Sequence, residues 1–174
     1  MIEASEDRNR FIVEPLQPHH ERSAFSCGVP ALDLYLHAQA SQDARRRVAV
    51  SFVLTPGDST VAGYYTLSQY AVSIGDLPQE IARKLPKYPL LPATLIGRLA
   101  ISTFFRGRGL GEFLLYDALR RCLTGSAQLA SIAVVVDAKD LAAATFYKKH
   151  GFIDLPAKPN RLFLPMGIVE KLFR

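Results

Sequence analysis

An apolar run is followed directly by a glycine-rich loop in the stretch Leu95-Ile96-Gly97-Arg98-Leu99-Ala100-Ile101-Ser102-Thr103-Phe104-Phe105-Arg106-Gly107-Arg108-Gly109-Leu110-Gly111. The run at 95–102 is typical of a β-strand. After the loop, one helical face carries Leu110, Phe113, Leu114, Ala118, Leu119 and Cys122. A strand, a glycine turn and a helix together point backbone N–H groups at one spot, and two arginines add positive charge. We therefore predict that the loop residues hold a pyrophosphate: Arg106, Gly107, Arg108, Gly109, Leu110 and Gly111.

The glycine spacing of this loop narrows the choice of ligand. A dinucleotide fingerprint needs GxGxxG and an acidic residue about 20 positions later. A Walker loop needs Gly-Lys-Ser/Thr. Neither pattern is present, and the spacing is instead Arg-x-x-Gly-x-Gly at the start of a helix. The alternative without a ligand is a tight turn whose glycines only allow close packing of helix and strand.

Length and composition predict one soluble domain spanning residues 1–174, because 49% of the residues are hydrophobic and 21% are charged. No run approaches the ~20 apolar residues of a membrane span, and the N-terminus lacks a signal-peptide core, so we expect a cytoplasmic protein that does not bind membranes. The two cysteines and four histidines show no metal-ligand spacing. We therefore expect no metal.

The net charge of +5 is unevenly distributed, because residues 81–111 contain no acidic side chain. Basic residues cluster there, at 45–47 and at 148–161. Two readings remain open. The cations are either a solvated surface with helix C-terminal charges, or the footprint of a polyanion larger than one cofactor.

Periodicity predicts alternating helices and strands without repeats or linkers. Expected helices cover 30–47, 76–85, 110 to about 122, and 137–149. Expected strands cover 48–54, 60–68, 94–102, 131–136, 152–153 and 161–168, with a stiff proline-rich connection before residue 94. This order indicates an α/β sandwich around a mixed sheet.

The loop and a second segment resemble the GNAT N-acetyltransferase family, whose acetyl-CoA loop reads Arg/Gln-x-x-Gly-x-Gly/Ala. The second segment is Val134–Ala138 followed by Ala142–Phe152, which contains Phe-Tyr-x-x-x-Gly-Phe. The resemblance implies an α/β fold with a mixed, mostly antiparallel central sheet, flanked by helices and splayed at the acetyl-CoA site. It also implies acetyl-CoA as co-substrate. Implied cofactor contacts beyond the loop are Leu99, Ala100, Ile101, Asp137, Ala143 and Phe146.

The same resemblance places Tyr147 near the thioester sulfur. Acetyl transfer to an amine expels a thiolate, and a positioned phenol can protonate it, so we expect Tyr147 to be the catalytic acid. The alternative is a packed aromatic side chain. No carboxylate stands out as a general base, and relatives often carry an aspartate where this chain has Ile101-Ser102. An α-amine, with a pKa near ~8, needs less help than a lysine at ~10.4, which favours an α-amine substrate.

Further motifs resemble the GNAT toxins of bacterial type II toxin–antitoxin modules. They include Phe25–Gly28, Leu32–Leu36, Gly63–Ser68, Leu85–Pro89 and Gly97–Ala100. This resemblance implies acetylation of the α-amino group of aminoacyl-tRNA, which blocks translation, and a homodimer. It also implies a ribbon-helix-helix antitoxin, with operator DNA bound only through the antitoxin complex. Expected tRNA contacts are Arg45, Arg46, Lys87, Arg98 and Lys148, since cations bind phosphates independently of sequence. For Arg98 a second role stays open, because it could instead order the edge of the strand.

Two alternatives remain at this point. The chain could be a GNAT enzyme acting on a small amine or a protein N-terminus, or a non-catalytic module that uses the fold as a scaffold. The intact loop and Tyr147 argue against the second alternative. No helix-turn-helix pattern is recognisable, so DNA binding is assigned to a partner.

Overall fold

A computed structural model describes residues 6–174, which form two compact units. One unit combines the chain up to Ser68 with Gly97–Ala118, and the other combines Gln69–Ile96 with Leu119–Arg174. Strands β3 (Gly63–Ser73) and β4 (Leu90–Ile101) and helix α5 (Leu110–Ser126) each contribute residues to both units. The assignment of one domain to residues 1–174 stays a prediction.

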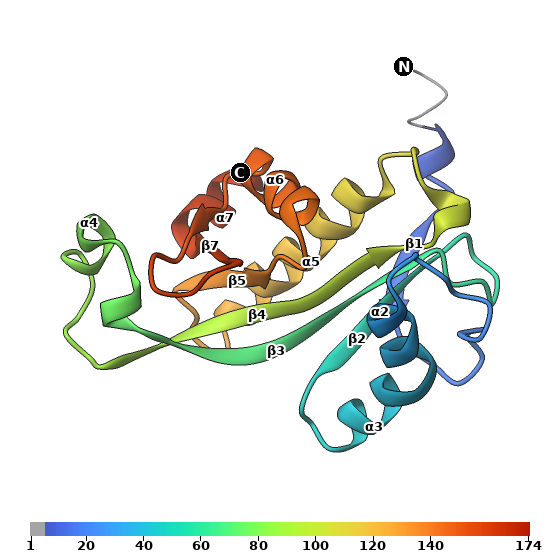
Figure 1. Cartoon of the computed structure of the whole chain (residues 1–174), viewed down its shortest axis with the longest axis horizontal. Helices are drawn as coiled ribbons and strands as arrows, with labels where there is room; N and C mark the ends of the chain where they lie inside the picture. The colour runs from blue at the N-terminus through green and yellow to red at the C-terminus, as the bar shows by residue number, and fades with distance from the viewer. Residues whose placement is uncertain (1–5) are drawn as a thin grey trace. The chain divides into compact units, whose positions relative to one another are not determined.

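The first unit contains the N-terminal sheet strands and the helices beside them (Figure 1). Its further elements are β1 (Ile12–Pro15), α2 (Pro30–Leu34), the π-helical η1 (Tyr35–Gln39), α3 (Ala40–Arg45), β2 (Val50–Thr55) and the 3₁₀ turn η3 (Thr103–Phe105). Antiparallel pairs run from Ile12↔Thr55 to Pro15↔Phe52 and from Val50↔Leu67 to Leu54↔Gly63. The core packs the helices on the sheet through Phe25, Cys27, Tyr35, Leu36, Ala40, Val53, Val61, Tyr64 and Ala100.

The second unit is built around a strand that is buried on both faces. This strand, β5 (Ala133–Asp137), runs parallel to β4 from Thr94↔Val134 to Ile96↔Val136 and antiparallel to β7 (Arg161–Pro165). Val134, Val135 and Val136 are fully buried, as a continuous apolar run predicts. The other elements are η2 (Ile74–Asp76), α4 (Gln79–Ala82), α6 (Leu141–Lys149), β6 (Ile153–Asp154) and α7 (Met166–Leu172).

The strands follow the order β1-β2-β3-β4-β5-β7-β6 in one seven-stranded sheet. Among the register pairs of residues 6–174, β4 with β5 is parallel and the others are antiparallel. The predicted fold class, a mixed and mostly antiparallel sheet flanked by helices, is therefore confirmed. The paired register of β4 with β5 covers Thr94–Ile96, and β4 continues to Ile101.

Several predicted boundaries were wrong for local reasons. The helix expected from Asp137 begins at Leu141, because Asp137 ends β5 and the Asp140 carboxylate caps the helix by accepting from the Ala143 N–H at 2.8 Å. The strand expected from residue 94 begins at Leu90. It tolerates Pro92, whose carbonyl accepts from the Ile132 N–H.

Other differences concern elements with weak sequence signals. Residues 166–168, expected as strand, start helix α7, and β1 was not predicted at all. The helix expected at 76–85 is only α4 (Gln79–Ala82) behind a 3₁₀ turn. The helix at 30–47 is confirmed but contains the π-helical segment and ends at Arg45, and Arg47 follows with a φ of 59°.

Candidate active site

Within the described residues, strand β4 extends to Ile101, beyond its paired register with β5 at Thr94–Ile96. The Ser102 N–H donates to the Ala62 carbonyl at 2.8 Å, and a Cβ on Gly63 would lie 2.9 Å from the Ala100 carbonyl oxygen. The backbone of Ala100 therefore faces β3, which approaches closely because Gly63 has no side chain. Since strand backbone groups alternate sides, the backbone groups of Leu99 and Ile101 face the opposite edge. Leu99, Ala100 and Ile101 are the predicted pantetheine partners, and this geometry favours Leu99 and Ile101.

The loop that follows has the backbone conformation of an anion cradle. Gly107 and Gly109 adopt φ values of 79° and 71°, which L-residues with side chains rarely tolerate. Helix α5 then begins at Leu110, which is buried, and its first turn closes with the Phe113 N–H donating to the Gly109 carbonyl at 3.2 Å. The N–H groups of the first turn of a helix have no partner within the helix and carry its positive dipole end. This geometry is compatible with the predicted pyrophosphate loop, and the contact of these residues with a pyrophosphate stays a prediction.

Arg106 has a contact that the sequence did not reveal. Its Nη2 donates to the Cys27 carbonyl, and a Cβ on Gly28 would lie 3.4 Å from the same nitrogen. The Cys27 N–H donates to Asp33 at 2.8 Å, so the turn at 26–28 is held from both sides. Arg106 therefore fixes the position of the loop in addition to supplying charge.

Tyr147 lies on α6 in the second unit, where it is 5% exposed. Its ring packs against Phe146 and Phe152 at centroid distances of 5.3 and 5.4 Å. Burial, with a smaller effect from the Asp137 carboxylate, raises the pKa of the Tyr147 phenol above its usual value of 10.0. The phenol therefore keeps its proton at neutral pH, which a general acid requires.

Asp137 is held by an ion pair that the sequence analysis missed. Arg161 Nε and Nη2 donate to the two carboxylate oxygens at 2.6 and 3.1 Å, and Arg161 Nη1 donates to the Tyr70 hydroxyl at 2.7 Å. These hydrogen bonds raise the pKa of Arg161. Asp137 and Arg161 are register partners on β5 and β7. The carboxylate of Asp137 is thus engaged within the protein, and a cofactor contact by this residue stays a prediction.

The remaining predicted cofactor residues lie on α6. Ala143 is half-buried in the first turn of α6, and its N–H donates to the Asp140 carboxylate that caps the helix. Phe146 is half-buried, and its ring lies beside the His150 ring. The loop residues thus belong to the first unit, and Asp137, Ala143, Phe146 and Tyr147 belong to the second.

The predicted tRNA contacts fall into two groups. Arg45, Arg46 and Lys87 are exposed. Arg98 instead lies over the Tyr35 ring, 3.5 Å from its centroid, and the Lys148 ammonium is 3.0 Å from the Asp154 carboxylate. The exposed group is available to phosphates, whereas Arg98 and Lys148 have intramolecular partners.

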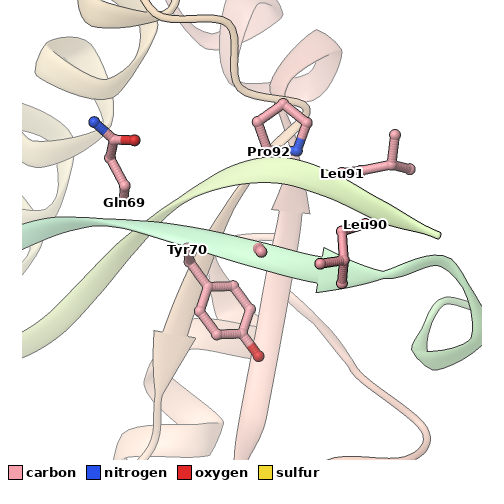
Figure 2. A pocket seen from close by; sticks show the side chains of 6 residues that line it. Gln69, Tyr70, Leu90, Leu91 and Pro92 are labelled. Atoms are coloured by element: carbon pink, nitrogen blue, oxygen red, sulfur yellow. The ribbon is translucent and has the colours of Figure 1, made fainter. Parts of the chain in front are cut away.

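An open hollow of about 450 Å³ lies on the part of β3 and β4 that belongs to the second unit (Figure 2). Gln69, Tyr70, Leu90 and Pro92 line it, with Ala71 and Leu91. None of the predicted cofactor residues lines this hollow. One of its lining residues, Tyr70, accepts a hydrogen bond from Arg161, the partner of Asp137.

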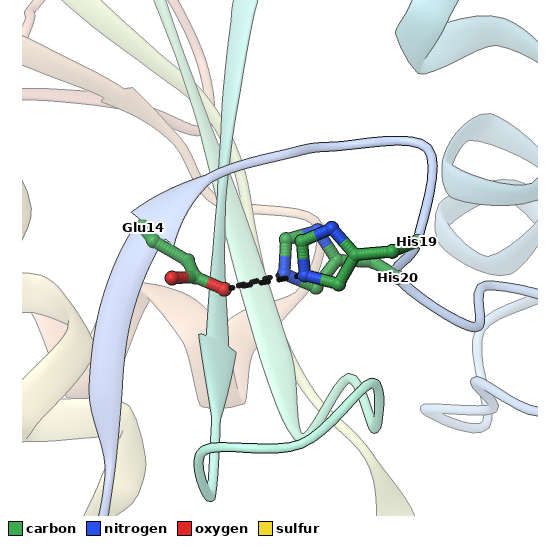
Figure 3. Close-up of side chains that lie close together, drawn as sticks. All are labelled: Glu14, His19 and His20. Atoms are coloured by element: carbon green, nitrogen blue, oxygen red, sulfur yellow. Dashed lines mark hydrogen bonds and ion pairs between the residues drawn. The ribbon is translucent and has the colours of Figure 1, made fainter.

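Glu14, His19 and His20 form a cluster that the histidine spacing did not predict (Figure 3). The buried His20 Nδ1 accepts from the Gln17 N–H at 2.9 Å, because an N–H can only donate. His20 Nε2 therefore carries the proton and donates to Glu14 Oε1 at 2.7 Å. A metal at Nε2 would need that proton moved to Nδ1, against the Gln17 N–H. The cluster is best explained as a brace for the turn after β1.

Within residues 6–174, none of the helices combines the length and the apolar character needed to cross a lipid bilayer.

The sequence matches the family model of the acetyltransferase (GNAT) domain over residues 58–154. The chain therefore belongs to the GNAT acetyltransferase family, as its loop and strand geometry indicate.

Curated relatives narrow the comparison to toxins. The chain is 33% identical over 171 residues to a probable toxin TacT of Sinorhizobium fredii, covering 92% of this chain and 94% of the relative. It is 35% identical over 144 residues to a tRNA-acetylating toxin of Mycobacterium tuberculosis, covering 83% and 85%.

Solved structures show the same fold with ligands and partners. AtaT complexed with acetyl-methionyl-tRNAfMet has a TM-score of 0.87 at 30% identity, covering 94% of this chain and 99% of that chain. A tyrosine-to-phenylalanine AtaT variant, bound to the C-terminus of the antitoxin AtaR and acetyl-CoA, has a TM-score of 0.80 at 28% identity, covering 94% and 97%. The AtaT–AtaR complex bound to DNA has a TM-score of 0.77 at 28% identity, covering 94% and 99%.

Proposed function

We propose that this chain is a toxin that transfers the acetyl group of acetyl-CoA to the α-amino group of aminoacyl-tRNA and so blocks translation. The observation that carries the donor assignment is the loop at 106–111, whose two positive-φ glycines open helix α5. The acceptor assignment is supported by one relative, the tRNA-acetylating toxin of Mycobacterium tuberculosis, and by the AtaT complex with acetyl-methionyl-tRNAfMet.

In the proposed reaction, a side chain supplies the proton and backbone groups supply the hydrogen-bond donors. The amine nitrogen attacks the thioester carbonyl carbon, the C–S bond breaks, and the thiolate takes a proton from the Tyr147 hydroxyl. Backbone N–H groups of Leu99 and Ile101 at the edge of β4 opposite β3 supply donors for pantetheine and for the carbonyl oxygen. An α-amine with a pKa near ~8 is partly neutral at physiological pH and can attack without a base. The amine nitrogen then loses a proton to solvent, and the Tyr147 oxygen takes a proton from solvent, which restores the phenol.

The expected partners follow from the same proposal. A ribbon-helix-helix antitoxin neutralises the enzyme, and operator DNA is bound through the toxin–antitoxin complex. The chain acts as a single-domain homodimer in the cytoplasm, where aminoacyl-tRNA is found. Solved AtaT complexes with AtaR and with DNA support the antitoxin part of this proposal.

The experiment follows radiolabelled acetyl-CoA into charged and uncharged tRNA. Label on charged tRNA alone, released as N-acetyl amino acid after mild alkaline hydrolysis, is the expected result. Absence of label from both, with label on small amines or protein N-termini, would instead establish an ordinary GNAT activity. Label on uncharged tRNA would contradict the α-amine as acceptor.

A further inference from the structure

The turn at residues 7–11 lies against the loop that we assign to acetyl-CoA. Phe11 is 6% exposed and meets the Phe105 ring edge to face at 5.9 Å. The Phe11 N–H donates to the Arg8 carbonyl at 3.1 Å, which closes the turn. The Asp7 carboxylate lies 3.6 Å from the Arg108 guanidinium. All of these residues belong to the first unit. The turn is therefore fixed to the loop by an aromatic contact and an ion pair.

The Arg8 side chain of this turn lies over Gly109. A Cβ built on Gly109 would lie 2.9 Å from Arg8 Nη2, 3.2 Å from Cζ and 3.4 Å from Nε. The guanidinium thus fills the space that a side chain at position 109 would take. Position 109 therefore favours glycine for two reasons: the guanidinium occupies the space of a side chain, and the backbone φ is positive.

The Arg8 guanidinium is incompletely satisfied in this position. Its Nε is buried and has no hydrogen-bond partner in the described part of the chain. A buried N–H of a charged group is costly to leave unpaired, and a phosphate oxygen is the acceptor that suits a guanidinium best. The loop beneath it is the one that the proposed function assigns to the pyrophosphate of acetyl-CoA.

We propose that Arg8 is a further cofactor-binding residue, whose guanidinium donates to the pyrophosphate of coenzyme A above Gly109. This inference rests on the use of acetyl-CoA in the proposed function. With Arg106 and Arg108, Arg8 brings three guanidinium groups to the loop. The planar donor fork of arginine suits the oxygens of a pyrophosphate. Asp7, which belongs to the same turn as Arg8, lies 3.6 Å from the Arg108 guanidinium.

The test measures binding without catalysis. Isothermal titration calorimetry gives Kd values for coenzyme A, 3′-dephospho-coenzyme A and pantetheine in the wild type and in Arg8→Ala. We expect Arg8→Ala to weaken both nucleotide ligands about tenfold, equivalent to about 1.4 kcal/mol. Pantetheine, which lacks the pyrophosphate, should bind both proteins alike. Arg10→Ala is the matched control, because Arg10 is exposed two positions away and should leave every Kd unchanged.

Three outcomes would overturn the inference. Unchanged coenzyme A binding by Arg8→Ala would remove Arg8 from the site, and tighter binding would show that Arg8 excludes the ligand. A loss confined to coenzyme A, with 3′-dephospho-coenzyme A unaffected, would assign the guanidinium to the 3′-phosphate instead.

Folding and the proposed function are controlled separately. If Arg8→Ala lowers the melting temperature, the Kd of Arg8→Lys for coenzyme A tests the inference instead, because this variant keeps the charge but loses the planar donor fork of arginine. Arg8→Lys should bind coenzyme A more weakly than the wild type, and wild-type affinity in this variant would contradict the role of the fork. Failure of the wild type itself to bind coenzyme A would overturn the proposed function, whereas a binding wild type with an unaffected Arg8→Ala overturns only this inference.

Discussion

The Arg98 guanidinium carbon lies 3.5 Å from the centroid of the Tyr35 ring. Tyr35 begins the π-helical segment, stacks on Tyr64 at 6.4 Å, and donates its hydroxyl to the Asp43 carboxylate at 2.9 Å. Arg98 on β4 therefore packs against the helices through one aromatic face. This contact favours an ordering role for Arg98 over a contact with tRNA phosphates.

Removing this contact should cost stability. We expect Arg98→Ala to lower the free energy of unfolding by about 1 kcal/mol, the range of a partly buried cation–π pair. Urea denaturation measures the change. Arg45→Ala, which removes an exposed arginine, should stay within about 0.5 kcal/mol of the wild type. Equal stability of Arg98→Ala and Arg45→Ala would contradict the ordering role.

Gly109 and Gly125 provide a matched pair of glycine substitutions. Gly109→Ala places a Cβ at a positive φ and within 3.4 Å of Arg8, so we expect it to distort the loop and weaken coenzyme A binding at least tenfold. Gly125 lies within α5 with no atom within 4 Å of an added Cβ, so Gly125→Ala should raise stability by about 0.5–1 kcal/mol and leave binding unchanged. Calorimetry and urea denaturation test both. Normal coenzyme A binding by Gly109→Ala would show that the loop conformation is not needed.

The parts of the site that could be predicted from sequence are those determined locally. The start of α5 after the glycine loop and the buried run Val134–Val136 each depend on neighbouring residues, and each was predicted correctly in type. The start of α6 was misplaced because Asp137 and Asp140 both look like caps, and strand pairing decides between them.

Contacts between distant residues could not be predicted, since they depend on register and packing. Asp137 meets Arg161 because β5 and β7 pair in one register. Arg8 reaches Gly109 because Phe11 packs on Phe105. No periodic pattern in the sequence marks either pair. For the same reason the intramolecular partners of Arg98 and Lys148 were not foreseen.

The Asp137–Arg161 pair should show measurable coupling. A double-mutant cycle of Asp137→Ala and Arg161→Ala should give an interaction free energy of about 1 kcal/mol, since the pair is bidentate but the Asp137 side chain is 42% exposed and screened by water. Lys148 and Asp154, which are more exposed at 50% and 63%, should couple more weakly. Additive effects of the Asp137 and Arg161 substitutions would contradict the coupling.

Alkaline pH should unfold the protein through its buried phenols. Burial raises the pKa of Tyr35 to about 12 and raises those of Tyr64 and Tyr147 as well, all above the unfolded value of 10.0. The stability from neutral phenols is therefore complete below pH 10 and decreases as pH rises toward the folded-state pKa values. Tyr64→Phe removes one such group, and its stability should fall less steeply above pH 10. Urea denaturation at pH 8 to 11 measures this, and parallel curves for the two proteins would contradict it.

Tyr147→Phe tests the acid role directly. The substitution removes one hydroxyl from a buried ring and keeps the packing against Phe146 and Phe152. We expect kcat for acetyl transfer to fall roughly 10²- to 10⁴-fold, the usual contribution of general acid catalysis, while the Kd of acetyl-CoA stays unchanged. Tyr88→Phe, on a side chain that is 64% exposed, controls for the loss of a phenol and should keep full activity. Expression of Tyr147→Phe in growing cells should accordingly fail to inhibit growth. Wild-type turnover by this variant would remove Tyr147 from the chemistry, and a parallel loss of acetyl-CoA binding would assign it to the cofactor site rather than to proton transfer.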